Sequence, residues 1–181
     1  MTKFFLAIEA SSSLEWRKKL QFFKRFDLCF LPEYHLAYKN TIKDSKAILW
    51  SYSKNNHHFC YPFMLSPIKI KKNNTYLETN FYDISSVYGY SGPISNSKNK
   101  NFLKRVWKEF DCWAKDNKII NEFIRFSFIP DTRIYSHENT EIVLNRMAAY
   151  SILPENTEKL LMDLGPKTRN MIRKAERLGL I

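Results

Sequence analysis

The chain has 181 residues, of which 44% are hydrophobic and 15% are aromatic. A chain of this length buries about 70% of the surface that it exposes when unfolded, and this composition excludes a generally disordered protein. Lysine and arginine give a formal net charge of +11, which attracts anionic partners. Nucleic acid, a lipid surface and a phosphorylated small molecule all meet that description, so charge alone does not choose among them.

The sequence carries little sign of targeting, disulfides or metal binding. The apolar run in MTKFFLAIEA is interrupted at Glu9 and is too short for a secretory signal or a membrane span, so we expect a cytoplasmic protein without a transmembrane segment. Widely separated cysteines without CxxC spacing predict free, buried thiols at Cys29, Cys60 and Cys112. No metal is assigned, because metal-ligand spacing is absent from the four histidines, His35, His57, His58 and His137.

The first half of the chain predicts helices followed by a β-hairpin. Helices are expected over residues 11–26 and from Pro32, and strands over residues 47–52 and 59–68, joined through the polar stretch SKNNHH. In the first helix, Trp16, Leu20 and Phe23 recur on one face. Ser12 and Glu15 have the spacing of a capping box.

The second half predicts an alternation of strands and helices. Strand and loop are expected over residues 69–100, a helix over 102–117, a strand over 119–129, a polar loop over 131–141 and a strand over 148–153. A helix with Pro154 in its first turn and a basic final helix complete the chain. A helix that leads into a strand is typical of an α/β domain, so the expected fold class is α/β (α+β).

The segment YDISSVYGYSGPI, residues 82–94, holds two of the four glycines of the chain. Gly89 and Gly92 permit positive φ angles or a close backbone approach, and Pro93 stiffens the exit, so we predict a tight and defined loop. Rings and hydroxyls for a ligand with a flat base and a polar tail are offered by Tyr82, Tyr88 and Tyr90. The alternative is a turn whose tyrosines pack on the sheet.

Asp83 and Glu122 are the carboxylates most nearly embedded in aromatic surroundings. Partial burial there would raise a carboxyl pKa toward the range useful for accepting a proton, which makes Asp83 the candidate catalytic residue. Either residue could instead be an ordinary hydrogen-bonded acid. Arg125 lies inside the apolar stretch EFIRFSF and needs a partner if it is buried, which Glu122 or a ligand phosphate would provide. A structural ion pair is the alternative.

The final stretch KTRNMIRKAERLGL combines an apolar stripe with basic faces. A helix N-terminus after Gly165 and Pro166, together with positive side chains, favours phosphate or pyrophosphate binding. The candidate phosphate-binding residues are Lys167, Arg169, Arg173 and Lys174, and a solvated basic face is the alternative. The chain contains no GxGxxG, GxxxxGK[ST] or GxSxG motif, which disfavours dinucleotide, P-loop and serine hydrolase chemistry.

Four motifs occur in a characteristic order: YPFMLSPI, YDISSVYGYSGPI, EFIRFSFI and MDLGPKTRNMIRKAERLGL. The ordered set, over about residues 59–181, resembles the N-terminal half of the FemAB-like transferases, a branch of the GNAT superfamily. This resemblance implies a single GNAT-like domain over residues 1–181, with a mixed β-sheet flanked by helices. It also implies that the basic helix at 166–181 leads to a second GNAT-like domain or subunit.

The resemblance implies an acyl- or aminoacyltransferase that acts on a cell-envelope precursor, either peptidoglycan or surface polysaccharide. The donor would be acyl-CoA or an aminoacyl-tRNA, with no covalently bound cofactor. This chain would be the acceptor-binding half and would hold a nucleotide-linked or lipid-linked precursor, with Tyr88 and Tyr90 near the ligand and Asp83 as a polar site residue. Such an enzyme would be cytoplasmic or peripheral at the inner face of the membrane.

Two departures from the family pattern bear on activity. The second domain is missing from this sequence, and no [QR]xxGx[GA] pyrophosphate loop is present. We therefore do not expect these 181 residues to catalyse transfer by themselves. Two alternatives stay open: a basic, aromatic-rich module for single-stranded nucleic acid, and an inactive truncated remnant.

Overall fold

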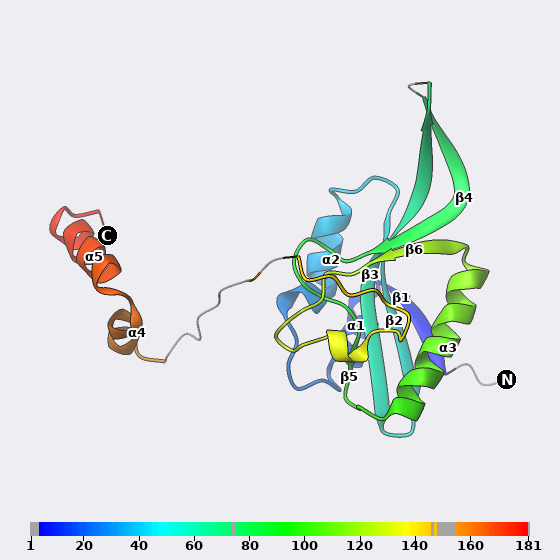
Figure 1. The fold of residues 1–181 in the computed structure, drawn as a ribbon, viewed down its shortest axis with the longest axis horizontal. Helices are drawn as coiled ribbons and strands as arrows, with labels where there is room; N and C mark the ends of the chain where they lie inside the picture. The colour runs from blue at the N-terminus through cyan, green and yellow to red at the C-terminus, as the bar shows by residue number, and fades with distance from the viewer. Residues whose placement is uncertain (1–3, 74, 146, 148–154, 181) are drawn as a thin grey trace. The chain divides into compact units, whose positions relative to one another are not determined.

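The computed structural model describes residues 4–73, 75–145, 147 and 155–180 (Figure 1). The chain divides into two compact units, Met1–Thr140 and Glu141–Ile181. The first unit is a mixed α+β domain in which helices flank a six-stranded mixed sheet, so the expected α+β class is confirmed. The predicted basic final helix belongs to the second unit.

The sheet is mostly antiparallel and contains one parallel pair. Its strands are β1 (Phe5–Glu9), β2 (Lys46–Lys54), β3 (His57–Lys72), β4 (Thr75–Ser85), β5 (Ile94–Ser95) and β6 (Ile119–Phe123). The order is β1-β2-β3-β4-β6, and β5 pairs with β3. The predicted hairpin is confirmed as β2 and β3, and β4 runs parallel to β6 after a crossover through α3 (Lys100–Asp116).

One face of the sheet is covered by the N-terminal helices α1 (Ser13–Leu20), η1 (Leu28–Phe30) and α2 (Pro32–Lys39). Trp16 and Leu20 of α1 are buried, as predicted for the apolar face of this helix. The helix expected over 11–26 is shorter than predicted, because α1 ends at Leu20, and Phe23 is buried but lies beyond the helix. The indole N–H of Trp16 donates to the carbonyl of Phe30 at 2.8 Å. The predicted capping box is wrong: Ser12 occupies the N-cap position, but its side chain makes no capping hydrogen bond.

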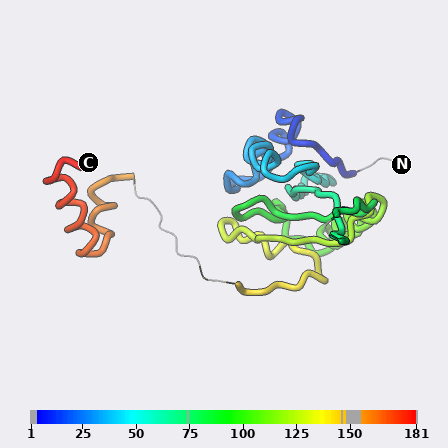
Figure 2. The backbone as a smooth tube through the Cα atoms, turned by 90° about the horizontal axis from the view of Figure 1, so that it is seen from above, coloured from blue at the N-terminus to red at the C-terminus, as the bar shows by residue number. Residues whose placement is uncertain are grey.

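The opposite face is covered by α3, and Figure 2 shows helical layers on both sides of the sheet. The Asn99 side chain caps α3 by accepting a hydrogen bond from the Phe102 N–H at 3.1 Å. Val106, Trp107 and Phe110 of α3 are buried against aromatic residues of the central strands, Trp50, Phe59, Tyr61 and Phe63. This aromatic core fixes α3, and therefore the crossover between β4 and β6.

Two predictions in the second half of the sheet domain need correction. The strand expected over 119–129 ends at Phe123. Beyond it the backbone leaves the β4 edge and makes a single parallel bridge between Phe126 and Ser91. Cys29 and Cys60 are buried free thiols as predicted, whereas Cys112 is exposed because it lies on the outer side of α3.

The second unit contains α4 (Thr157–Asp163) and α5 (Pro166–Arg177). The Asn156 side chain caps α4 by accepting from the Glu158 N–H at 2.7 Å, so this helix begins after the predicted start. Pro154 and the strand predicted over 148–153 lie outside the described residues. No helix among the described residues is long and apolar enough to cross a membrane.

Candidate functional site

The glycine-rich loop lies between β4 and β5. Gly89 has φ +122° and Gly92 has φ +100°, which confirms the predicted positive φ angles. A Cβ atom at Gly89 would stand 2.5 Å from the Cys29 Sγ, and one at Gly92 would stand 3.0 Å from the Thr132 Oγ1. Both glycines are therefore needed for backbone conformation and for close packing.

Hydrogen bonds hold this loop from two sides. The Tyr34 hydroxyl, on α2, donates to the Tyr88 carbonyl at 2.5 Å. The Ser91 carbonyl accepts from the Thr132 hydroxyl at 2.7 Å and from the Ser127 N–H at 2.9 Å. Because these partners come from segments far apart in the sequence, the loop keeps one conformation only when the whole domain is folded.

Arg125 extends beside this loop between two aromatic rings. Its guanidinium carbon lies 5.7 Å from the ring centroid of Tyr88 and 5.6 Å from that of Phe123. The Arg125 backbone N–H donates to the Ser86 hydroxyl at 3.0 Å, which fixes the start of the side chain. Stacking on aromatic faces orients a guanidinium while leaving its edge free to donate hydrogen bonds.

Of the two partners considered for Arg125, Glu122 is not the one found, and the alternative of a structural ion pair is wrong. Arg125 is exposed, and no ion pair among the described residues includes it. The cause is the early end of β6, which places Arg125 outside the sheet. An exposed cation without a carboxylate partner, held between two rings, suits an anionic ligand.

Asp83 shares a face of the sheet with the ring that supports Arg125. On β4, Ile84 is buried on the α3 side, so its neighbours Asp83 and Ser85 lie on the opposite face. Phe123 is the β6 partner of Ser85 and shares that face. Burial raises the pKa of Asp83, as the sequence led us to expect.

Glu122 lies on the other face and does not join this group. Its carboxylate accepts a hydrogen bond from the hydroxyl of the buried Tyr61. Although the outer surface of Glu122 is exposed, burial of its carboxylate raises its pKa, and the Tyr61 hydrogen bond opposes that shift. The same burial, with Glu122 alongside, raises the pKa of Tyr61 well above its ordinary value. This pair links β3 to β6 and has a structural role.

The remaining predicted tyrosines have separate environments. Tyr88 is 70% exposed and Tyr90 is 41% exposed. The Tyr90 ring meets Phe128 edge-on at 5.4 Å between centroids. Tyr82 is the cross-strand partner of Pro67 on β3 and of Ile119 on β6. Of the predicted tyrosines, Tyr88 is the one that the structure brings against Arg125.

Sequence reasoning missed the residues that support the loop, namely Cys29, Tyr34, Phe123 and Thr132. Only Phe123 had a local signal, because it stands two residues before Arg125 in an apolar stretch. The others come from distant segments, and no spacing along the chain identifies them.

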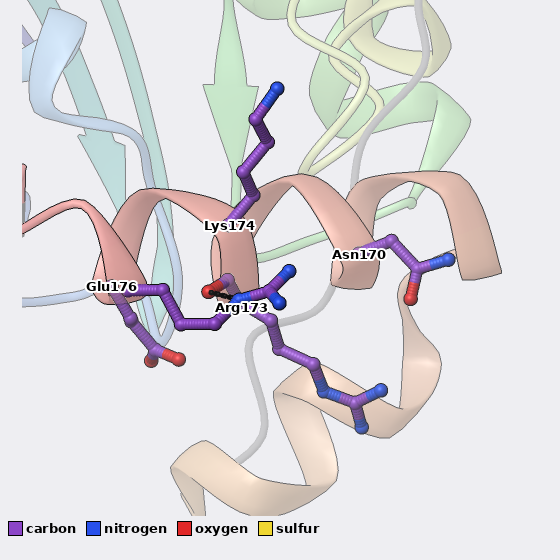
Figure 3. A pocket seen from close by; sticks show the side chains of 5 residues that line it. Asn170, Arg173, Lys174 and Glu176 are labelled. Carbon is purple, nitrogen blue, oxygen red and sulfur yellow. Dashed lines mark hydrogen bonds between the residues drawn. The ribbon is translucent and has the colours of Figure 1, made fainter.

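The predicted phosphate-binding residues all lie on α5, in the second unit. Gly165 is the N-cap and Pro166 the first helical residue, as predicted. The Arg169 guanidinium donates to the Met162 carbonyl at 3.2 Å and so joins α5 to α4. Figure 3 shows an open depression on the surface of α5, lined by Asn170, Arg173, Lys174, Glu176 and Arg177. Phosphate binding there stays a prediction.

The described residues contain no group of three histidine, cysteine or acidic side chains that could hold a metal ion. Comparison of the chain with protein-family models, with curated proteins and with solved structures finds no match. The geometry of the loop and of Arg125 is therefore the basis for a functional proposal.

Proposed function

We propose that this chain is the acceptor-binding half of an FemAB-like, GNAT-type acyl- or aminoacyltransferase for a cell-envelope precursor. The observation that carries the proposal is the position of the Arg125 guanidinium between the rings of Tyr88 and Phe123, beside the glycine-rich loop. The ordered motifs and the crossover from β4 through α3 to a parallel β6 agree with a GNAT-like sheet.

The acceptor would bind through charge and flat surfaces together. Arg125 would donate to a phosphate or carboxylate of a nucleotide-linked or lipid-linked precursor. The exposed ring of Tyr88 would stack on a flat group, and the Tyr90 hydroxyl would supply a further hydrogen bond. Gly89 and Gly92 would let the backbone approach the ligand closely.

The transfer itself would need the donor, acyl-CoA or aminoacyl-tRNA, and a second GNAT-like domain or subunit. An amine or hydroxyl of the acceptor would attack the thioester or ester carbonyl, the new amide or ester bond would form, and the thiol or the tRNA hydroxyl would leave. Asp83, with its raised pKa, would accept the proton that the nucleophile loses. Holding both substrates in position would supply much of the rate acceleration.

Calorimetric titration with a nucleotide-linked peptidoglycan precursor tests the acceptor site in this chain. Arg125→Ala should weaken binding by about tenfold or more, because a charge-assisted hydrogen bond is lost. Tyr90→Phe should weaken binding less and leave stability nearly unchanged. Arg105→Ala, at an exposed arginine of α3, is the matched control and should bind as the wild type does.

Equal affinity of the wild type, Arg125→Ala and Tyr90→Phe would contradict the proposal. Retention of a single-stranded RNA that falls steeply with salt, with no preference for nucleotide-linked sugars, would favour the nucleic-acid alternative.

A further inference from the structure

Helix α5 has an apolar stripe whose large side chains, Met171 and Leu178, stay exposed, whereas Ala175 and the neighbouring Ile172 are half-buried. Met171, Ala175 and Leu178 follow one another at intervals of four and three residues and so share one side of the chain's last helical stretch. Met171 is 64% exposed and Leu178 is 62% exposed. Neither α4 nor α5 contains a buried residue, so this part of the chain has no core of its own.

The remaining surface of α5, including the border of the stripe, is basic. The helix carries five basic residues, Lys167, Arg169, Arg173, Lys174 and Arg177, and Glu176 is its one acidic residue. Arg173 and Arg177 are one turn apart, and the Arg177 Nε–H donates to the Arg173 carbonyl at 3.3 Å. Figure 3 shows the Lys174 side chain pointing away from Arg173, so the cations spread over a broad surface.

Three classes of partner would be attracted by this helix, and two of them fit poorly. Single-stranded nucleic acid is bound by stacking on aromatic rings, and the sequence from Thr157 to Arg177 contains no aromatic residue. A soluble phosphate compound would engage the cations and leave the apolar stripe in water. An anionic bilayer surface takes both, because the stripe enters the acyl boundary while the cations meet the headgroups.

We propose that α5 is an interfacial helix that binds the surface of a bilayer containing anionic lipids. Its axis lies along the membrane plane, with Met171, Ala175 and Leu178 toward the acyl chains. Lys167 and Lys174 lie one residue or one turn from this stripe, and their long stems extend from the apolar boundary to the headgroups. This inference does not rest on the proposed transferase function.

Vesicle flotation of the full 181-residue chain tests the inference. Vesicles of phosphatidylcholine alone are compared with vesicles that contain about 30% phosphatidylglycerol, at low and at physiological salt. We expect binding to the anionic vesicles only, weakened by salt. Arg173→Glu/Arg177→Glu should weaken it by at least about 30-fold, because each basic residue near an anionic surface contributes about 1 kcal/mol. Met171→Ser/Leu178→Ser should weaken it by about tenfold.

Matched controls separate this helix from the general charge of the protein. Lys71→Glu/Lys72→Glu makes the same charge change at exposed positions of β3, and Ile70→Ser/Leu77→Ser makes the same kind of apolar change on the β3 and β4 hairpin. Both controls should bind anionic vesicles nearly as the wild type does. Since all eight altered side chains are exposed, circular dichroism should show every variant folded.

Three results would overturn the inference. The first is failure of the wild type to float with anionic vesicles at low salt. The second is an equal loss in the lysine control and in the α5 charge variant, which would assign binding to net charge. The third is an unchanged affinity of Met171→Ser/Leu178→Ser, which would mean that the helix binds headgroup phosphate, or soluble phosphate, without entering the interface.

Discussion

The loop of residues 86–93 and helix α5 are both short, and both were predicted from sequence to bind a ligand: the loop one with a flat base and a polar tail, and the helix a phosphate or pyrophosphate. In the loop, Gly89 packs against Cys29, the Tyr88 carbonyl is bonded to Tyr34, and Ser91 is bonded to two further segments. In α5 no residue is buried. The first region takes its shape from the rest of the domain, whereas the second depends on the hydrogen bonds of its own helix and on the contact of Arg169 with the neighbouring α4.

This difference separates two ways of binding a charged partner. A loop held by distant contacts presents Arg125 and Tyr88 in one geometry, which suits recognition of a defined small molecule. A helix with an apolar side and a basic side presents charge without fixed side-chain positions, which suits an extended surface. Mutations should therefore affect the two regions very differently, and stability measurements can test that.

The largest expected effect on stability is at the aromatic core of the sheet domain, which carries the loop. Trp107→Ala should lower the free energy of unfolding by about 3–5 kcal/mol, because it leaves a cavity and also removes the indole donor to the Tyr135 carbonyl. Met171→Ala on α5 should change it by less than about 0.5 kcal/mol. Denaturant unfolding measures both, and similar losses at the two sites would contradict the difference between the two regions.

A pH effect of nearly the same size is expected from His35. This residue is fully buried, and burial lowers the pKa of its imidazole from 6.5 to about 4. Between pH 6.5 and pH 4 the imidazole of His35 is protonated in the unfolded chain but neutral in the folded protein. The free energy of unfolding therefore falls as the pH drops toward 4, by about 3 kcal/mol in total. His35→Gln should remove this part of the pH dependence, and NMR titration of His35 should find its imidazole neutral at pH 6.

Gly89 in the loop and Gly165 before α5 should differ in how well they tolerate a side chain. Gly89→Ala should cost about 3 kcal/mol, because φ is positive and the new Cβ would stand 2.5 Å from the Cys29 Sγ. Gly165→Ala should cost less than about 0.5 kcal/mol, since no atom lies within 4 Å of its Cβ position. Thermal unfolding compares the two variants.

Cys29→Ala provides the control for the clash. Added to Gly89→Ala, it removes the sulfur and should restore part of the lost stability, so the two changes should not be additive. Strict additivity would show that the Cys29 sulfur does not limit the space at residue 89.

The smallest expected effect on stability concerns the Tyr61–Glu122 pair, which lies on the face of the sheet opposite Asp83. Burial raises the pKa of Glu122, so between its ordinary pKa of 4.5 and the raised value the folded protein holds more protons than the unfolded chain. This contribution to stability is present at low pH and is lost as the pH rises through the raised pKa. The difference in unfolding free energy between the wild type and Glu122→Gln should therefore fall as the pH rises. A constant difference would mean that this carboxylate titrates normally.

Local patterns predicted the elements well. The spacing of Trp16 and Leu20 identified α1, and apolar runs identified β2 and β3, because periodicity reports which side of an element is buried. The same spacing extended the predicted helix to Phe23, which is buried but lies beyond the end of α1 at Leu20. The end of β6 was missed, since residues 124–129 are as apolar as the strand itself. Beyond the strand, Phe126 instead bridges Ser91, a contact between distant segments that no local pattern predicts.

The candidate site was predicted in part for the same reason. Glycines at 89 and 92 gave a local signal for an unusual backbone, and the structure has that backbone. The position of the Arg125 side chain depends on contact with Tyr88, 37 positions earlier in the chain, and no spacing rule predicts such a contact. The sequence likewise grouped Asp83 with Glu122, but the alternation of side chains along β4 and β6 puts them on opposite faces.

The thiol of Cys29, which lies next to Gly89, can report when the loop opens. Cys29 is 6% exposed, so a thiol reagent reaches it only when the loop lifts away. Cys112 is exposed on α3 and reacts without any opening, which provides an internal standard for the intrinsic rate. Cys60 lies in the sheet and is 1% exposed, so it reports opening of the whole domain. The labelling rate of Cys29 relative to that of Cys112, followed by intact-protein mass spectrometry, then reports opening of the loop, and a bound acceptor should lower it.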